Sequence, residues 1–476
     1  MKLDNRSKWT YSIGSVGRDM AYTLVSMFLL LYIQYTMNLS TGQFAVISVI
    51  MVVCLIWDAI NDILMGMIIE NTTMKWGKFK PWIFIGAILN SLVIILMFTI
   101  RLSGWNYVLF FGVTYLLWGM TYTMNDISYY GMLPSLTSDP KERDSLVALM
   151  NIFISVGQFS VATIVPMLVA GNAIQVYRMV AIGVAILLVL FQSVTVFGVI
   201  ERPRRDASEK LHLKGMITLF KRNDQLQGIG IAHVFYNVGS GLLILFGMNF
   251  FYVEFGYARG GALITVFTVM YGVGTLLSQV FFTPLTGRFS RKALLKVIIL
   301  IVAISYLLFL SLGYVLPMHE VLIYALGLVI FFSQGLFNLL MIVMINNTIE
   351  YDEARFGLRH DSVISAVRSF AVKFSGAINQ GIVALTLILS GIYNASQEIS
   401  ALEQDVSTEL ITRDTVLLEA EFIISRILDN QKLILRLGMV ILPIMMMVIS
   451  YTIIKRRYKI DEAYYLELLE EIEQKK

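Results

Sequence analysis

The feature that most constrains this chain is a series of long apolar runs that recurs from its beginning to its end. A run of about 20 apolar residues can cross a hydrocarbon layer roughly 30 Å thick as a helix. Only 15% of the 476 residues are charged, where soluble domains carry about 25%. We therefore predict an all-α polytopic membrane protein. Strand barrels are excluded, because runs such as AILLVLFQSVTVFGVI do not alternate in polarity.

The apolar runs predict twelve transmembrane helices. Most of the 37 Lys and Arg residues fall in segments that are cytoplasmic if both termini are cytoplasmic, as the positive-inside rule requires. The net charge of +4 therefore reflects membrane topology and gives no reason to expect nucleic acid as a partner. We predict a multi-pass protein of the cell membrane, with spans at roughly residues 10–36, 42–70, 81–101, 105–132, 146–170, 174–200, 227–254, 260–285, 293–316, 320–349, 362–391 and 433–455.

Charge and repeats divide the predicted spans into two six-helix halves, residues 1–200 and 227–456. A charged cytoplasmic linker, 201–226, joins the halves, and residues 457–476 form a cytoplasmic tail. The triplet Gly77-Lys78-Phe79 follows the second span, and Gly287-Arg288-Phe289 follows the eighth. A parallel repeat of six plus six helices is the layout of major facilitator transporters.

One predicted external connection, residues 394–432, is unusually long and acidic. Its segment TVLLEAEFIISRIL could form a short amphipathic helix on the outer surface. We expect the connection as a whole to be a solvated spacer.

Four aspartates lie inside the predicted spans, although a carboxylate near the centre of a membrane helix costs about 2.5 to 3.5 kcal/mol. The clear basic candidate within a span is Lys373, and Arg18 lies nearer the membrane surface. The four aspartates and Lys373 are predicted at one depth, so we expect them to share one polar centre. The aspartates are Asp19, Asp58, Asp62 and Asp126.

Asp58 and Asp62 are four residues apart, so they share one helix face, and Asn61 projects the same way. Two carboxylates and an amide oxygen suit a small cation. Without a cation, their mutual repulsion would favour a bound proton. Thr123, one turn before Asp126, can add a hydroxyl. The alternative is a structural ion-pair network that closes the helix bundle.

A second solute is expected to bind beside the cation. A bound cation relieves the repulsion among the carboxylates and so raises the affinity for the solute, and the solute must raise the affinity for the cation by the same factor. A neutral polyol such as a sugar fits this role. The carboxylates of Asp19 and Asp126 can accept hydrogen bonds from ring hydroxyls, and Tyr122 and Tyr130 offer aromatic faces to ring carbons.

Several motifs resemble the glycoside-pentoside-hexuronide:cation symporter family of the major facilitator superfamily, most closely its melibiose permease branch. The resemblance spans nearly the whole chain and implies a secondary transporter that moves a sugar with Na⁺, Li⁺ or H⁺ by alternating access. The motifs are WDAIND at 57–62, KWGKFKPWIFIG at 75–86, LWGMTYTMND at 117–126, RNDQL at 222–226, NNTIEYDEARFGLRHDSV at 346–363 and AVKFSGA at 371–377.

The resemblance also implies roles for matching residues. The cation site would comprise Asp58, Asp62, Asn61 and Thr123, a set that favours Na⁺ as the bound metal ion. The sugar site would comprise Asp19, Arg18, Asp126, Tyr122, Tyr130, Asn151 and Lys373. Asn151 stands where the melibiose-type pattern has an arginine, so the galactoside specificity of that branch does not carry over.

Other functions remain as alternatives at this stage. A carrier of the same fold with another cargo, such as a lysolipid, shares part of the WDAIND signature, and a channel is a further alternative. A membrane-embedded enzyme is not expected, because the one cysteine and four histidines form no nucleophile or metal cluster. We expect no cofactor, a co-transported cation, the lipid bilayer as surroundings, and a monomer.

Overall fold

The structure is a computed structural model that describes residues 3–72, 74–137, 139–201, 218, 220–357 and 361–475. These residues are mostly helical and contain no β-strand, which confirms the predicted all-α class. The predicted linker, 201–226, falls largely outside the described residues.

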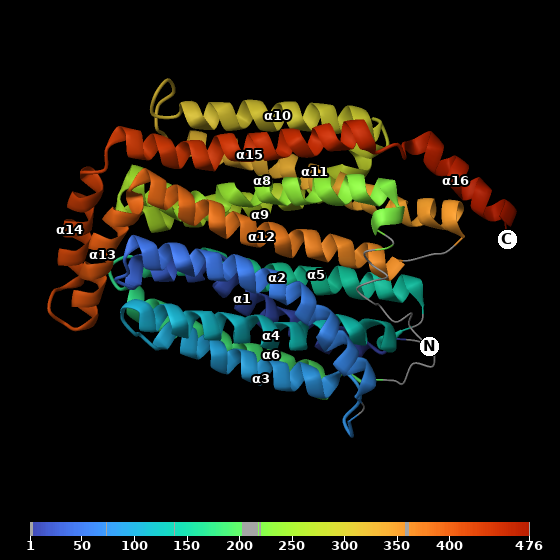
Figure 1. Ribbon diagram of the computed structural model, residues 1–476, viewed down its shortest axis with the longest axis horizontal. Helices are drawn as coiled ribbons and strands as arrows, with labels where there is room; N and C mark the ends of the chain where they lie inside the picture. The colour runs from blue at the N-terminus through green and yellow to red at the C-terminus, as the bar shows by residue number, and fades with distance from the viewer. Residues whose placement is uncertain are drawn as a thin grey trace. The chain divides into compact units, whose positions relative to one another are not determined.

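Among the described residues, the long helices agree closely with the predicted spans (Figure 1). Within the described part of the chain, eleven helices are long and apolar enough to cross a membrane. α4 has 33 residues but is not one of the eleven, and its C-terminal half carries Thr123, Asn125 and Asp126. The long helices are α1 (Asn5–Thr36), α2 (Thr41–Asn71), α3 (Lys80–Thr99), α4 (Gly104–Leu136), α5 (Pro140–Val169), α6 (Ala173–Gly198), α8 (Asp224–Phe255), α9 (Tyr257–Thr286), α10 (Arg291–Ser311), α11 (Glu320–Phe356), α12 (Asp361–Ser390) and α15 (Asp429–Arg457).

Local sequence signals fix several helix ends. Ser40 begins α2 with a capping box, in which its side chain and that of Gln43 satisfy each other's backbone N–H groups. Asp4 caps α1 and Ser290 caps α10 through side-chain oxygens that accept backbone N–H groups. α11 ends at Gly357, whose φ of 73° lies in the left-handed region that favours glycine.

The chain divides into two compact units. The first comprises Met1–Ser208, Phe251–Thr265 and Leu387–Leu428, and the second comprises Glu209–Phe250, Val266–Thr386 and Asp429–Lys476. In the first unit, α1 packs against α5 and α6, α3 packs against α4 and α6, and α2 packs against α4. A Cβ at Gly17 would lie 2.7 Å from the carbonyl oxygen of Leu187, so only glycine permits α1 to approach α6 this closely. This close packing sets the position of the next residues in α1, Arg18 and Asp19.

In the second unit, α10 packs against α11 and α15, and α16 (Glu462–Lys475) packs against α11. Polar groups join the buried helices. The Tyr236 hydroxyl donates to the Gln334 carbonyl at 2.7 Å, and Gln334 Nε2 donates to the Tyr306 hydroxyl at 3.0 Å. Such interhelical bonds satisfy polar groups that lipid cannot.

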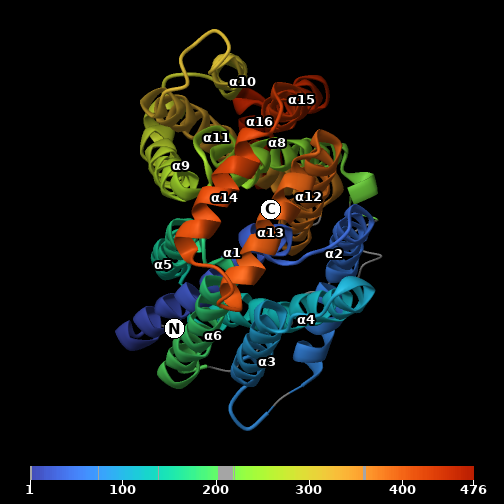
Figure 2. The same cartoon turned by 90° about the vertical axis from the view of Figure 1, so that its left-hand side faces the viewer.

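The segment predicted as a solvated spacer, 394–432, is instead mostly helical. It forms α13 (Ile392–Ser407) and α14 (Arg413–Ser425), which lie together at one end of the first unit and run crosswise to α1 (Figures 1 and 2). α13 packs against α1 and α6 and buries Ser396, Ser400 and Glu403 on one face. The spacer prediction was wrong because this face of α13 is buried, with Ile392, Tyr393 and Ile399 beside the three polar residues, although the segment as a whole has a polar composition.

Candidate cation and solute site

α4 brings the candidate residues of both predicted sites onto one helix. Its opposite side is held by buried amides: Asn90 Nδ2 donates to the Thr121 hydroxyl at 2.9 Å, and Asn125 Nδ2 donates to the Ile83 carbonyl at 2.8 Å. These bonds fix the rotation of α4 about its axis. The helix therefore presents Thr123 and Asp126 to its neighbours in a defined direction.

The first cluster is built around Arg18, whose side chain is only 2% exposed. Its Nε and Nη2 donate to Asp19 Oδ2 at 3.1 and 2.8 Å. Nη1 lies 3.3 Å from Asp126 Oδ1, an ion-pair distance without hydrogen-bond alignment. Nη2 also donates to the Tyr130 hydroxyl at 3.2 Å. Two carboxylates from two helices thus share one buried guanidinium.

The structure adds residues to this cluster that the sequence did not single out. Gln158 of α5 donates from Nε2 to Asp19 Oδ1 at 3.2 Å. The Arg18 guanidinium also lies over the rings of Tyr129 and Tyr130, 4.7 Å from each centroid. Both contacts depend on how α1, α4 and α5 pack, and neither has a spacing signal in the sequence.

An aromatic row continues from this cluster along α4. The rings of Phe111, Tyr115, Trp118 and Tyr122 stack in succession, with centroid distances of 5.3, 5.5 and 5.8 Å. Tyr22 of α1 lies beside the row, 5.3 Å from the Tyr122 ring. A polar cluster next to aromatic faces is suited to a solute with both hydroxyl groups and apolar ring faces.

The second cluster joins α2 to α4. The Thr123 hydroxyl oxygen lies 2.9 Å from Asp58 Oδ1 and 3.1 Å from Asp62 Oδ1, so both carboxylates reach a single hydroxyl. Asn61 is 6% exposed, and its Nδ2 has no hydrogen-bond partner among the described residues. The carboxylate and hydroxyl oxygens are ligands of the kind that a small hard cation prefers, and the Asn61 amide oxygen stays a predicted ligand.

The described residues contain no group of three or more His, Cys, Asp or Glu side chains that could hold a metal ion. The candidate cation site brings two carboxylates within hydrogen-bond distance of one neutral hydroxyl oxygen.

Two other residues singled out in the sequence, Asn151 and Lys373, belong to other helices. Asn151 of α5 is exposed, and among the described contacts its side chain joins neither cluster. Lys373 of α12 is half-buried in the second unit, and its role stays a prediction. Asp352, at the acidic end of α11, is fully buried and pairs with Arg222 at 3.1 Å.

Comparisons with known proteins agree with this architecture. Residues 10–418 match the family described as MFS/sugar transport protein. A lactose permease of Lactobacillus delbrueckii subsp. bulgaricus is 25% identical over 99% of this chain and 73% of its own length. A putative glycoside/cation symporter of Escherichia coli (strain K12), YagG, is 26% identical over 84% of this chain and 86% of its own length. Three other relatives, two lactose permeases and a raffinose carrier, are longer, and the match spans 62 to 65% of their length.

A solved structure shows the same fold. A bacterial homolog of the human lysosomal transporter Spinster, in an inward-facing and unoccupied conformation, aligns with a TM-score of 0.61. The alignment covers 98% of this chain and 96% of that chain at 13% sequence identity. The predicted twelve-helix major facilitator fold is confirmed.

Proposed function

This chain belongs to the MFS/sugar transport protein family and, within it, to the glycoside-pentoside-hexuronide:cation symporters, and from this membership we propose that it carries a sugar or glycoside together with a monovalent cation. Its family members are transporters rather than enzymes. The proposal includes the cell membrane as location, cytoplasmic termini, a monomer and alternating access between the two sides. Na⁺ is the favoured coupling ion.

The position of the Thr123 hydroxyl is the observation that best supports this proposal. It lies within hydrogen-bond distance of both Asp58 and Asp62, so oxygens from three residues converge on one small region. Two carboxylates this close repel each other, and a bound cation removes the repulsion. A proton would need only one carboxylate, whereas Na⁺ uses the hydroxyl and the Asn61 amide oxygen as further ligands. The complete oxygen set therefore favours Na⁺ over H⁺.

The Arg18 cluster supplies the groups for a sugar. Asp19 and Asp126 offer acceptors to ring hydroxyls, and Arg18 offers donors that its fork geometry holds in one plane. Tyr122 and Tyr22 offer ring faces. Thr123 and Asp126 are one helix turn apart, so a change at the cation site is transmitted to the solute site through a single rigid element.

Uptake measurements test the proposal. Membrane vesicles that contain the wild-type protein should accumulate at least one member of a labelled glycoside panel when an inward Na⁺ gradient is imposed. Asp58→Asn should abolish this accumulation while sugar exchange without a gradient persists. Asp144→Asn, at an exposed position of α5, serves as the matched control and should behave as wild type.

Two results would overturn the proposal. Equal gradient-driven accumulation by wild type and Asp58→Asn would remove the assigned role of Asp58. If no glycoside is transported but a lysolipid is, the assigned cargo is wrong and the alternative carrier function replaces it.

A further inference from the structure

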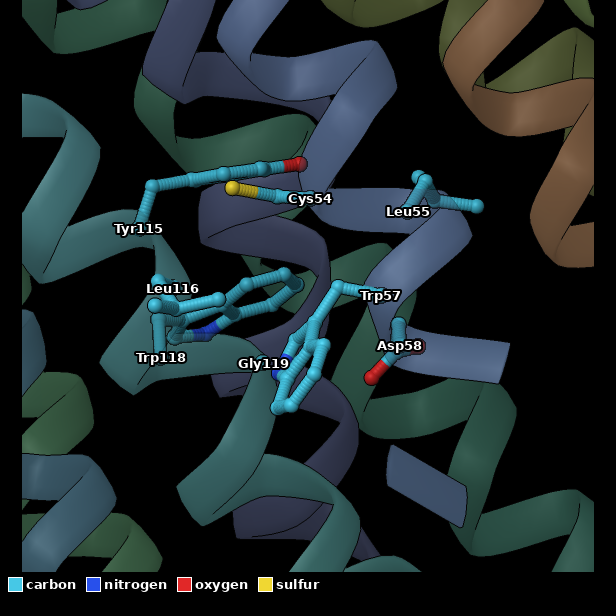
Figure 3. Close-up of a pocket in the computed structure, with 8 residues that line it drawn as sticks. All are labelled: Cys54, Leu55, Trp57, Asp58, Tyr115, Leu116, Trp118 and Gly119. Carbon is cyan, nitrogen blue, oxygen red and sulfur yellow. The ribbon is translucent and has the colours of Figure 1, made fainter. Parts of the chain in front are cut away.

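A small cavity lies between α2 and α4, beside the predicted cation ligands (Figure 3). Its volume is about 30 Å³. A single water needs about 10–15 Å³ on this measure, so the cavity holds one or two water-sized bodies and not a sugar ring. The residues that matter to its chemistry are Cys54, Trp57, Asp58, Tyr115, Trp118 and Gly119.

Three aromatic side chains form part of the wall, beside Leu55 and Leu116. Trp57 projects from α2 toward α4, and Tyr115 and Trp118 stack on the α4 side with ring centroids 5.5 Å apart (Figure 3). Trp118 is 9% exposed, and its indole N–H is buried without a hydrogen-bond partner among the described residues. Neighbouring rings of the row cover the faces of Tyr115 and Trp118, whereas Trp57 lies outside the row, and an indole face is the aromatic surface that attracts a cation most strongly.

The cavity ends at a carboxylate. Asp58 lines it and also reaches Thr123 through Oδ1, so this one side chain belongs to both the cavity and the candidate cation site. Gly119 faces the same oxygen, because a Cβ at this position would lie 3.6 Å from Asp58 Oδ1. That is an ordinary contact distance, so a methyl group would narrow the cavity without displacing the carboxylate.

The α4 wall of the cavity also connects with the solute site. Tyr115 and Trp118 belong to the same stacked row as Tyr122, whose ring lies 5.3 Å from Tyr22 of α1. The cavity therefore shares its α4 wall with the aromatic row that leads to the Arg18 cluster. A purely structural packing void would have no reason to end at an acidic side chain in the middle of a membrane helix.

We propose that this cavity is a vestibule that a small monovalent cation occupies on its way to Asp58, with the ring face of Trp57 and the Asp58 carboxylate replacing part of its water shell. The inference rests on the proposed cation coupling and adds the path of the ion and a role for Trp57 and Gly119. Because the cavity is too small for a sugar, the ion and the solute reach their sites through different spaces.

Cys54 is a built-in reporter, since it is the chain's one cysteine and lines the vestibule. The cavity is open on one side, so a thiol reagent can reach the half-buried Cys54 although the cavity cannot hold the whole reagent. We would measure the rate at which a cationic methanethiosulfonate, and its neutral methyl analogue, modify Cys54 in the purified protein. Na⁺ at ten times its dissociation constant leaves about one site in eleven empty, so modification should slow about tenfold. Choline at the same ionic strength should not protect Cys54.

Glycine variants provide the matched comparison. Gly119→Val should fill the vestibule, slow the modification of Cys54 and reduce the initial rate of Na⁺-driven uptake several-fold. Gly112→Val is the control on the same face of α4, because a Cβ there would also lie 3.6 Å from a side chain of α2, that of Ile50. It should leave both rates unchanged. Gly119→Ala gives a milder version of the effect if the valine variant does not fold.

The outcomes separate the vestibule from the proposed function. If Asp58→Asn loses Na⁺-driven accumulation, but Na⁺ does not protect Cys54 and Gly119→Val transports like Gly112→Val, the vestibule is wrong and the transport function stands. If Asp58→Asn accumulates glycoside like wild type, the assignment of Asp58 to the cation site is wrong, and the vestibule proposal is wrong as well. Protection by Na⁺ together with a selective effect at Gly119 supports the vestibule.

Discussion

Replacing Glu403 with alanine should lower the melting temperature of the protein substantially, although Glu403 lies outside the membrane-spanning helices. Glu403 of α13 is fully buried. Its Oε1 accepts the Gly171 N–H and the Tyr257 hydroxyl, each at 2.8 Å, and its Oε2 accepts the Ala173 N–H at 2.7 Å. Asn172, the residue that precedes α6, provides no side-chain cap. Glu403 therefore does the capping of α6 from a distant part of the chain.

The size of the effect follows from these three bonds. The alanine variant leaves three donors without their acceptor, and Ala173 and Tyr257 are themselves fully buried. A buried donor left unsatisfied costs about 1–3 kcal/mol, so the lower bound for the variant is about 3 kcal/mol. At about 2–4 °C per kcal/mol for a unit of this size, the melting temperature should fall by about 6 °C or more.

Thermal unfolding of the purified protein in detergent, followed by intrinsic tryptophan fluorescence, measures this shift. Glu398→Ala is the matched control, because Glu398 lies on the same helix but is 52% exposed in its pair with Arg426. Surface pairs of this kind contribute at most about 1 kcal/mol. A melting temperature for Glu403→Ala within error of that for Glu398→Ala would refute the capping role.

Three further predictions follow from individual contacts. Burial raises the pKa of the Glu403 carboxyl above its ordinary value of 4.5, so its contribution to stability should fade as the pH rises through the raised pKa. Glu403→Gln should therefore flatten the plot of melting temperature against pH in this range. Thr123→Val should weaken Na⁺ binding about tenfold or more, since hydrogen bonds to charged groups contribute about 1.5–3 kcal/mol, whereas Thr114→Val, which loses only bonds within α4, should not. Arg18→Lys should weaken sugar binding at least about tenfold in equilibrium binding assays while Na⁺ binding persists, because lysine cannot reproduce the planar fork that holds Asp19.

Hydropathy predicted the long helices well because a membrane helix must satisfy one strong requirement, a long apolar segment. The span expected at 105–132 is α4, Gly104–Leu136, and the span expected at 42–70 is α2, Thr41–Asn71. The shared face of Asp58 and Asp62 likewise follows from helix periodicity alone, and the structure brings both to one hydroxyl.

Contacts between helices that are distant in sequence could not be predicted from the sequence. Gln158 reaches Asp19 only because α5 packs against α1, and no local spacing of residues indicates that contact. α13 was missed for another reason. Ser396, Ser400 and Glu403 recur at helical spacing and are buried, but polar residues at such spacing usually indicate a solvated face. The partners that make burial of Glu403 favourable come from segments more than 140 residues away in sequence.

α4 places a constraint on how the proposed coupling can operate. Thr123 contacts both carboxylates of the candidate cation site, and Asp126, one turn further on, lies at ion-pair distance from Arg18. A cation that draws Asp58 and Asp62 inward must reorient Thr123. Because a helix turn is rigid and buried amides fix the rotation of α4, a change in the orientation of Thr123 must also change the position of Asp126. Any free energy that the cation contributes to sugar binding must reappear as a contribution of the sugar to cation binding. Measured Na⁺ affinities with and without sugar should therefore differ by the same factor as the sugar affinities with and without Na⁺, and Thr123→Val should reduce both factors together.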